Sequence, residues 1–591
     1  MTAQDGFSET RSDLANALGT FLIADYGAKS LSEGDLKPYH RHGVDYGWRL
    51  PGDPPLRLLL DRAFPYRPPR IALEDEAFLL VWPHVERLGL LCVYPAETNI
   101  DALSPDQVAV HLIDEARALV ARSKSENHDA AFRQEFQSYW SLATDQGAPI
   151  YRSLVRPHGP TRRIRAWRGQ NKTSLIRVLG ETDDALCNWL DHANGPAPRE
   201  GWKLYDAVLV WLDTPLIPDA YPVHASDVEA LIRESAGRDR DYAPLLDVSQ
   251  TTDVLIGAPV ETGVCFGAVY IERPDQKKLQ KGFRPGHVPA AHAKRYATSP
   301  ARQAKKAIVD RIDPAWVHGR DHDGDIGQLE SSSVLVIGCG ALGASVAVLL
   351  AQAGLGHFTL YDGQYLDRTN TSRHPLGADY VDQNKAKALA KHLTKRFPHL
   401  RGVDDHDAHV DIRVIDKLPS LDSADLVISA TGEWASMSLI ADAARSWDVP
   451  LQTIWHEPQA LAAHSVLTLP NGACLRCGFD RLGKPLLEAT LQDETAVWRR
   501  IPACGGAFTP YGAAQLAFTS GFCASEALKH LTATPAGARH SIWVASDEVL
   551  AAGNAERTAA FKSEFDSGPH GARVSRPWAL GAECPLCGPH V

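Results

Sequence analysis

A glycine turn in the C-terminal half of the chain constrains the fold most. The aliphatic run Val334–Ile337 breaks into Gly338-x-Gly340-x-x-Gly343 and then into an Ala- and Leu-rich segment. This order predicts a strand, a tight turn and a helix whose N-terminal N–H groups can face a phosphate, although a plain packing turn has the same pattern. A second predicted strand ends in Asp362, where a carboxylate can accept hydrogen bonds from ribose hydroxyls. Together they predict a nucleotide site.

The length and charge of the whole chain narrow the possible classes. At 591 residues, the chain exceeds one hydrophobic core, so we expect about three or four domains. A net charge of −11 argues against nucleic acid as the main partner. No apolar run reaches about 18 residues and no secretion leader is evident, so we expect no membrane span and a cytoplasmic location.

The N-terminal part predicts a helix followed by a small antiparallel sheet. Helical spacing covers residues from about 10 to 27, and the strand-like runs are Gly47–Leu50, Leu56–Leu60 and Arg70–Leu73. A proline-rich segment, Phe64-Pro-Tyr-Arg-Pro-Pro69, and Trp82-Pro-His84 precede Cys92, and a further amphipathic helix follows. On chemistry alone, a cysteine between Leu91 and Val93 is more often a small buried apolar residue than a nucleophile.

This order of elements resembles the ubiquitin-conjugating fold. That family carries Tyr-Pro-Phe-x-Pro-Pro and His-Pro-Asn ahead of its thioester cysteine, and the resemblance covers roughly residues 10 to 145 of a predicted domain 1–148. It implies that Cys92 holds a ubiquitin-like C-terminus as a thioester. His84 stands where the family has the asparagine that helps to stabilise the oxyanion, so an imidazole N–H would have to donate instead.

The middle part, residues 149–315, predicts a mixed α/β linker domain without an assignable site. Strand-like stretches alternate with a helix-like segment near Val228. The basic run Arg162, Arg163, Arg165 and Arg168 is expected to be a solvated surface, with an anionic contact as the alternative. Residues 299–309 are expected to be helical.

Polar and cationic residues follow Asp362 at spacings that a dehydrogenase does not need. Asn370, Arg373 and Lys385 suit an enzyme in which a carboxylate attacks an α-phosphate, because the cations Arg373 and Lys385 can offset the repulsion between the two anions. The segment 316–591 resembles the ThiF/MoeB/ubiquitin-activating superfamily, with a Rossmann-like adenylation domain that binds ATP and Mg²⁺. The resemblance implies that Arg320 reaches across a homodimer. The magnesium-binding Asp of that family is missing, and Glu433 is the candidate replacement.

Cysteines of the C-terminal part fall into pairs and single residues. Cys474-x-x-Cys477 and Cys584-x-x-Cys587 predict a Cys₄ zinc site, with a redox pair or two unlinked turns as alternatives. Cys504 lies between Pro and Gly-Gly and is the candidate for the first thioester, ahead of Cys523 in a buried helical pattern. Cys339 is expected to be a packing residue.

The order of the two motif-bearing domains resembles the bacterial activating/conjugating fusion proteins of CBASS anti-phage operons. It implies that ATP activates a protein C-terminus, in that family the C-terminus of a CD-NTase (a cyclic-oligonucleotide synthase), which then passes through Cys504 and Cys92 to an unidentified acceptor amine. Two alternatives remain open. One is a sulfur-carrier adenylyltransferase in which the N-terminal domain only docks a partner, and the other is a nucleotide-binding scaffold without chemistry.

Overall fold

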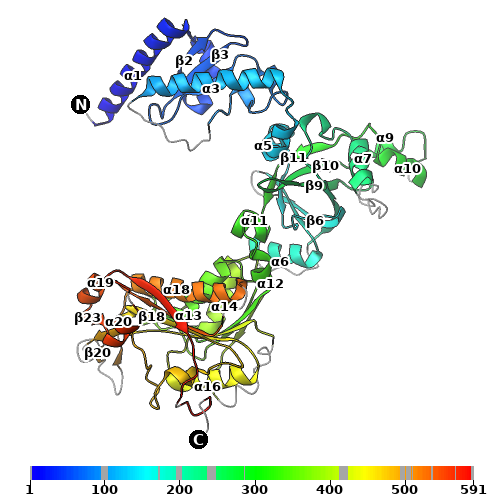
Figure 1. Cartoon of the computed structure of the whole chain (residues 1–591). Helices are drawn as coiled ribbons and strands as arrows, with labels where there is room; N and C mark the ends of the chain where they lie inside the picture. Colours follow the sequence, from blue (N-terminus) through cyan, green and yellow to red (C-terminus); the bar gives the residue numbers. More distant parts are fainter. Residues whose placement is uncertain are drawn as a thin grey trace. The chain divides into compact units, whose positions relative to one another are not determined.

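The chain is described here by a computed structural model (Figure 1). The structure describes residues 1–591 except 1–2, 95–103, 171–173, 195–201, 236–247, 285–286, 412–422, 493–498, 501–506, 509, 534–536, 566, 583 and 588–591. Two compact units result, one of Met1–Leu186 with Trp202–Arg311 and one of Cys187–Gly201 with Ile312–Val591. Among the described helices, none combines the length and apolar character needed to cross a bilayer.

The first sheet of unit 1 is antiparallel, with strand order β1-β2-β3-β4. Its elements are α1 (Ala3–Tyr26), β1 (Lys29–Ser30), α2 (Glu33–Leu36), β2 (Val44–Leu50), β3 (Leu56–Asp61), β4 (Arg70–Leu73) and α3 (Pro105–Ser125). The apolar sides of α1 and α3 bury Leu18 and Ile113 against Leu58 of the sheet. The predicted N-terminal helix and the three predicted strands are therefore confirmed.

Two short helices, α4 (Asp129–Gln134) and α5 (Phe136–Leu142), connect this sheet to the next. Trp140 of α5 is fully buried, and its indole N–H donates to the Ala307 carbonyl (2.9 Å). Aromatic contacts with Phe136 and Tyr221 complete the packing around Trp140. The helix α5 is thereby fixed on the second sheet of unit 1.

The second sheet has eight strands in the order β11-β10-β9-β8-β6-β7-β5-β12. Its elements are β5 (Ile150–Ser153), β6 (Arg162–Gln170), β7 (Leu175–Gly180), α6 (Asp183–Asn194), β8 (Leu204–Trp211), α7 (Ala225–Ser235), β9 (Thr252–Val260), β10 (Gly263–Ile271), α9 (Gln276–Leu279), α10 (Ala290–Ala297), β11 (Lys305–Ala307) and β12 (Val309–Arg311). Only Ile308 separates the two edge strands, so the sheet must curl until its edges approach. The expected mixed α/β character of this region is confirmed.

The expectation of a helix over residues 299–309 is wrong. The helix α10 ends at Ala297, and Lys306 instead pairs with Val269 in an antiparallel ladder. The Ala304 N–H donates to the Val223 carbonyl (2.9 Å) just before this strand. Tertiary pairing therefore overrides the helical preference of this Ala- and Lys-rich segment.

The basic run on β6 is also not the solvated surface that we expected. Arg162 pairs with Glu181 (2.5 Å), and Arg168 pairs with Asp253 (2.7 Å), which is fully buried. Arg165 contacts carboxylates on both sides, at Asp183 and Asp206. Carboxylates from neighbouring segments compensate these guanidinium groups, which makes the run a structural element of the sheet.

Unit 2 contains a doubly wound sheet in the order β15-β14-β13-β16-β17-β18-β22-β24. Its strands are β13 (Ser333–Ile337), β14 (His357–Tyr361), β15 (Gly402–His406), β16 (Leu426–Ser429), β17 (Leu451–His456), β18 (Ala462–Thr468), β22 (Arg539–Val544) and β24 (Ala572–Pro577), and its helices are α11 (Pro314–Gly319), α12 (Ile326–Ser331), α13 (Ala341–Gln352), α14 (Lys385–Arg396), α16 (Trp434–Ser446), α18 (Ala513–Thr532), α19 (Asp547–Ala552) and α20 (Ala559–Glu564). The first five strands are parallel and the last three are antiparallel. Unit 2 also contains two short antiparallel sheets of two strands each. One pairs β19 (Thr490–Gln492) with β23 (Ala555–Arg557), and the other pairs β20 (Arg499–Arg500) with β21 (Ala507–Phe508).

Helices cover both faces of this sheet (Figure 1). Val336 and Leu360 point to the face covered by α13, α14 and α18, and Leu335 points to the face covered by α16. This arrangement confirms the predicted Rossmann-like fold class. The predicted boundaries at 148/149 and 315/316 remain predictions.

Candidate active site

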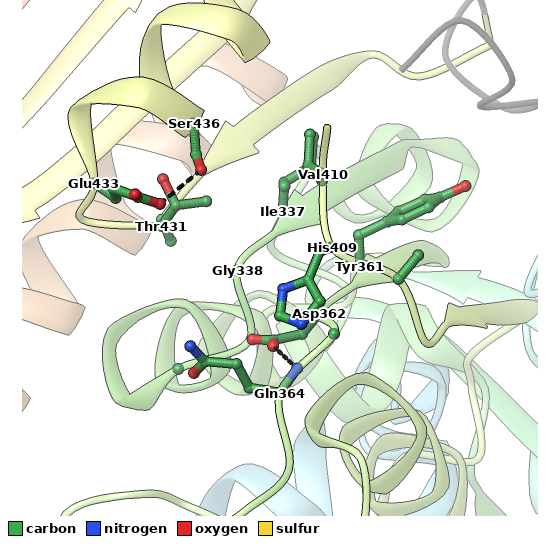
Figure 2. Close-up of a pocket in the computed structure, with 14 residues that line it drawn as sticks. Ile337, Gly338, Tyr361, Asp362, Gln364, His409, Val410, Thr431, Glu433 and Ser436 are labelled. Carbon is green, nitrogen blue, oxygen red and sulfur yellow. Dashed lines mark hydrogen bonds between the residues drawn. The ribbon is translucent and has the colours of Figure 1, made fainter. Parts of the chain in front are cut away.

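A pocket lies at the carboxyl ends of β13, β14, β15 and β16. Strand order reverses between β14 and β16 on either side of β13, which is the place where doubly wound sheets bind ligands. Figure 2 shows Thr431, Glu433 and Ser436 on one side of the pocket and Asp362 and His409 on the other. The predicted glycine turn supplies Gly338 and Gly340 to the lining.

The three glycines of the turn have different local surroundings. Gly338 has a φ of +96°, and a Cβ there would lie 2.8 Å from the Ala430 carbonyl oxygen. A Cβ on Gly343 would overlap the Gly338 carbonyl oxygen. Around Gly340, no atom lies within 4 Å of the Cβ position. Gly338 and Gly343 are therefore required for packing, whereas Gly340 keeps the pocket side of the turn open.

Asp362 holds the turn through hydrogen bonds to its carboxylate. The Cys339 N–H donates to Oδ2 (2.8 Å) and the Gln364 N–H donates to Oδ1 (2.7 Å). Cys339 itself is fully buried, and burial raises the pKa of its thiol well above the usual value. Cys339 is thus a packing residue, as expected, and Asp362 faces the pocket from the end of β14.

Lys385 begins α14 behind this pocket and is mostly buried, at 8% exposure. Its ammonium group donates to the Gln364 side-chain oxygen (2.8 Å), and Gln364 lines the pocket. The neighbouring Asn384 donates to the Asp362 carbonyl (2.7 Å). Lys385 therefore does not line the pocket itself, but its ammonium group contacts Gln364, which does.

Asn370 and Arg373 lie outside the pocket lining. Asn370 ends a short 3₁₀ helix, and its side-chain oxygen accepts from the Asp367 N–H (3.3 Å). The Arg373 guanidinium lies over the Tyr511 ring, 5.0 Å from its centroid. Next to it, His374 is buried and bonds the Cys339 carbonyl (2.9 Å), which ties this segment to the glycine turn.

Arg320 is also outside the pocket lining of its own chain. It follows α11 with a φ of +50°, and its guanidinium lies over Trp316 (4.9 Å to the ring centroid). One of its N–H groups donates to the Trp316 carbonyl (3.2 Å). The structure thus brings together the glycine turn, Asp362 and, through Gln364, Lys385, whereas Asn370, Arg373 and Arg320 are not among the residues that line the pocket.

Side-chain oxygen atoms lie close together around Glu433, the candidate magnesium ligand. Glu433 precedes α16 and lines the pocket, and the Ser436 hydroxyl donates to its carboxylate (3.0 Å). The Thr431 hydroxyl oxygen is buried and has no hydrogen-bond partner among the described residues. A hard cation such as Mg²⁺ prefers oxygen ligands, so Thr431 and Glu433 fit one side of such a site.

Cys92 is exposed in a second pocket, which lies in unit 1. The Cys92 N–H donates to the His84 carbonyl (2.9 Å), and the pocket also receives Arg67, Arg70 and Glu86. Its exposure excludes the reading of Cys92 as a buried apolar residue. Partial burial raises the pKa of the Cys92 thiol, and the carboxylates of Glu86 and Glu135 raise it further.

Two residues beside Cys92 escaped sequence reasoning. Tyr139 of α5 accepts a hydrogen bond from the His84 N–H (2.9 Å) and donates to the Glu135 carboxylate (2.8 Å). The His84 ring also faces Glu135, with Nδ1 3.5 Å from Oε2. His84 has a φ of +62°, and these contacts hold its loop. Helices α3 and α4 separate Cys92 from Glu135 and Tyr139 in the sequence. No local motif around Cys92 could therefore identify these two residues.

The four paired cysteines come together in unit 2. Their sulfur atoms all lie within 4.8 Å of one another, and Cys474 Sγ is 3.9 Å from Cys477 Sγ and 3.5 Å from Cys584 Sγ. A tetrahedral site with Zn–S bonds of about 2.3 Å requires sulfurs about 3.8 Å apart. Cys474, Cys477, Cys584 and Cys587 therefore fit a zinc ion.

The candidate for the first thioester, Cys504, lies outside the described residues. The alternative, Cys523, is fully buried in α18, and burial raises the pKa of its thiol. A thiol so placed is a poor nucleophile, which agrees with its expected inert role. Cys187 and Cys265 are likewise buried.

Comparisons with known proteins match two regions of the chain. Residues 20–149 match the prokaryotic E2 family B, and residues 320–553 match the ThiF family. The chain is 24% identical over 498 residues to the ATP-dependent ubiquitin transferase-like protein Cap2 of Vibrio cholerae, which covers 76% of this chain and 81% of that protein.

Other similarities are shorter. Cap2 of Pseudomonas aeruginosa is 32% identical over 174 residues, and the uncharacterized protein y4qC of Sinorhizobium fredii is 29% identical over 188 residues. These two alignments cover 29% of this chain and span only 30% and 32% of those proteins. The crystal structure of Escherichia coli MccB with MccA-N7isoASN is 19% identical, with a TM-score of 0.33, and covers 45% of this chain and 69% of that chain. Two regions of the chain are therefore similar to the prokaryotic E2 family B and to the ThiF family, and most of its length is similar to a Cap2 ubiquitin transferase-like protein.

Proposed function

We propose that this chain is an ATP-dependent enzyme that adenylates the C-terminal carboxylate of a protein, carries it as a thioester and conjugates it to an amine. One observation carries the proposal. A pocket built on the glycine turn and Asp362 lies in the ThiF-matching region, and an exposed cysteine, Cys92, lies in the E2-matching region of the same chain. Activation and conjugation need these two kinds of site.

The adenylation step uses ATP as a substrate. An oxygen of the protein carboxylate bonds to the α-phosphorus, and the bond to the leaving pyrophosphate breaks, which gives an acyl-adenylate. Both reactants are anions, so fixed positive charge must offset their repulsion. The buried Lys385 supplies such charge behind Gln364, and Arg373 is proposed to supply more from the segment next to the turn.

Mg²⁺ would neutralise phosphate charge during this step. Glu433 and Thr431 would hold it, as their oxygen atoms at the pocket suggest. The four clustered cysteines would hold a structural zinc ion that joins the C-terminal segment to the loop at Cys474. Arg320 is proposed to complete the site from the partner chain of a homodimer.

Transfer then passes through two thioesters. The Cys504 thiolate attacks the acyl carbon and releases AMP, and the Cys92 thiolate attacks next and releases Cys504. An acceptor amine finally attacks the Cys92 thioester, the C–N bond forms, and the Cys92 thiolate leaves. Each stage keeps an activated carbonyl, so covalent catalysis divides a difficult condensation into easier steps.

The protein substrate is proposed to be the C-terminus of a CD-NTase in a cytoplasmic anti-phage system. The resemblance to CBASS fusion proteins and the similarity to Cap2 support this choice. The acceptor amine is left open.

A gel assay tests the proposal. The chain is incubated with ATP, Mg²⁺ and the product of a neighbouring gene as the candidate CD-NTase, and reducing and non-reducing gels are compared for wild type, Cys92→Ala and Cys504→Ala. We expect adducts that a thiol reagent removes, loss of final conjugates in both variants, and pyrophosphate release that persists in both. Conjugates formed by Cys92→Ala would refute the role of Cys92.

A sulfur-carrier adenylyltransferase is the second candidate. The chain is 31% identical over 156 residues to the Aedes aegypti adenylyltransferase and sulfurtransferase MOCS3, but this covers only 26% of the chain. That function predicts a thiocarboxylate product, detectable by its mass, and unchanged activity in Cys92→Ala and Cys504→Ala.

A further inference from the structure

An aromatic pair outside the pocket holds the side chain of Arg373. The guanidinium lies over the Tyr511 ring, with 5.0 Å between the guanidinium carbon and the ring centroid. Tyr511 also meets the His456 ring edge-to-face, with centroids 4.6 Å apart. Burial lowers the pKa of His456, and Arg373 lowers it further, so the imidazole stays neutral beside the guanidinium. Tyr511 is thus a platform between Arg373 and the end of β17.

The backbone at Arg373 is anchored to the nucleotide pocket. His374 is 4% exposed, and its Nε2 lies 2.9 Å from the Cys339 carbonyl in the glycine turn. The Leu376 N–H donates to Nδ1 of the same ring (3.4 Å), so Nε2 carries the proton and donates to Cys339. The backbone at Arg373 is therefore fixed to the glycine turn, and only the Arg373 side chain requires a further contact to hold it in place.

The end of β17 anchors the chain on both sides of the segment that contains Cys504. Before that segment, the Ala489 and Thr490 N–H groups donate to the buried carboxylate of Glu457 (2.6 and 2.8 Å). After it, Tyr511 packs on His456, the residue next to Glu457. Two consecutive residues therefore hold both flanks, and Tyr511 is the flank residue that also contacts Arg373.

We propose that Tyr511 is a positioning residue that orients Arg373 toward the phosphates of bound ATP. The inference rests on the proposed function, in which Arg373 offsets phosphate charge. An unsupported arginine side chain samples many rotamers, and a guanidinium held over an aromatic ring loses this freedom before the ligand arrives. Arg373 supported by Tyr511 would then bind triphosphate better than Arg373 without that support.

Titration of the full chain with Mg·ATP, followed by calorimetry, tests the proposal. We expect Tyr511→Ala to weaken ATP binding about threefold to tenfold, in line with the strength of cation–π contacts, and Tyr511→Phe to keep the affinity of wild type. Adenosine has no phosphates, so its affinity should be equal in wild type and Tyr511→Ala. A substitution that only damages the structure would weaken the binding of both ATP and adenosine.

A double-mutant cycle shows whether the effect passes through Arg373. In an Arg373→Ala background, Tyr511→Ala should cause no further loss of ATP affinity. Phe518→Ala is the matched control, because Phe518 is an exposed aromatic residue of α18 whose ring stacks on Trp543. It should leave ATP binding unchanged.

The outcomes separate the inference from the proposed function. If wild type does not bind ATP, the proposed function fails. If Arg373→Ala weakens ATP binding but Tyr511→Ala leaves it unchanged or tightens it, the positioning role of Tyr511 is wrong. Equal losses for ATP and adenosine in Tyr511→Ala, or additive losses in the cycle, would also overturn it.

Discussion

At the scale of single residues, two glycines of the turn have different roles: Gly343 is required for packing, and Gly340 keeps the pocket open. Gly343→Ala would drive a methyl group into the Gly338 carbonyl oxygen, whereas the Gly340 Cβ position is open. We expect Gly343→Ala to destabilise unit 2 by about 1–3 kcal/mol, as overpacking typically does.

Gly340→Ala should keep the melting temperature of wild type but weaken ATP binding, because its methyl group would occupy space in the pocket. Thermal unfolding and ATP titration of both variants check this pair of outcomes. Equal melting temperatures for the two variants would contradict the packing role of Gly343.

The Cys92 thiol offers a second test at this scale. Because Glu86 and Glu135 raise its pKa, removing either charge should lower the pKa and increase the thiolate fraction at a given pH. We expect Glu135→Gln and Glu86→Gln to shift the pH profile of Cys92 alkylation by iodoacetamide toward lower pH, as followed by mass spectrometry of the Cys92 peptide. Glu126→Gln at the end of α3 is the control. An unshifted profile in both variants would show that these carboxylates do not act on the thiol.

At the scale of elements, local patterns were predictable and distant contacts were not. The strand, turn and helix from Ser333 to Gln352 followed from spacing alone, because each part is specified by its own residues. The helix expected over residues 299–309 failed, since pairing with β10 decides that segment.

The residues of the candidate sites show the same difference between local patterns and distant contacts. Asp362 and the paired cysteines are recognisable from short motifs, whereas Tyr139 at Cys92 and Tyr511 at Arg373 are brought close only by the fold. The basic run on β6 was misinterpreted for the same reason, because its carboxylate partners lie on other segments.

The cysteine cluster joins two elements that are far apart in the sequence. Trp578, the residue after β24, donates from its indole N–H to the Cys474 carbonyl (3.0 Å), and Cys584 follows shortly after. We expect one zinc ion per chain by elemental analysis, and Cys584→Ser should lose it and lower the melting temperature. Cys187→Ser, at a buried cysteine outside the cluster, should keep the zinc. Zinc retained at full stoichiometry by Cys584→Ser would refute the site.

At the scale of the whole molecule, the nucleotide pocket and Cys92 belong to different compact units. In the proposed function, an acyl group activated in unit 2 must therefore reach unit 1 to be conjugated. A covalent carrier meets this need, because a thioester keeps the acyl group bound between steps. The proposed Cys504-to-Cys92 relay accordingly predicts that separate chains carrying Cys92→Ala and Cys504→Ala restore conjugation on mixing only if transfer also occurs between chains.

Arg320 provides a whole-molecule test of the proposed homodimer. Its guanidinium lies on Trp316, and Arg320 is not among the residues that line the pocket of its own chain. Arg320→Ala and Lys385→Ala should each abolish ATP–pyrophosphate exchange with the CD-NTase. If Arg320 acts across the dimer, a mixed dimer has one intact site, so random mixing should restore roughly a quarter of wild-type activity. If Arg320 acts within its own chain, or if the chain is monomeric, mixing restores nothing. Sedimentation of the mixture distinguishes these two failures, because a dimer excludes the second.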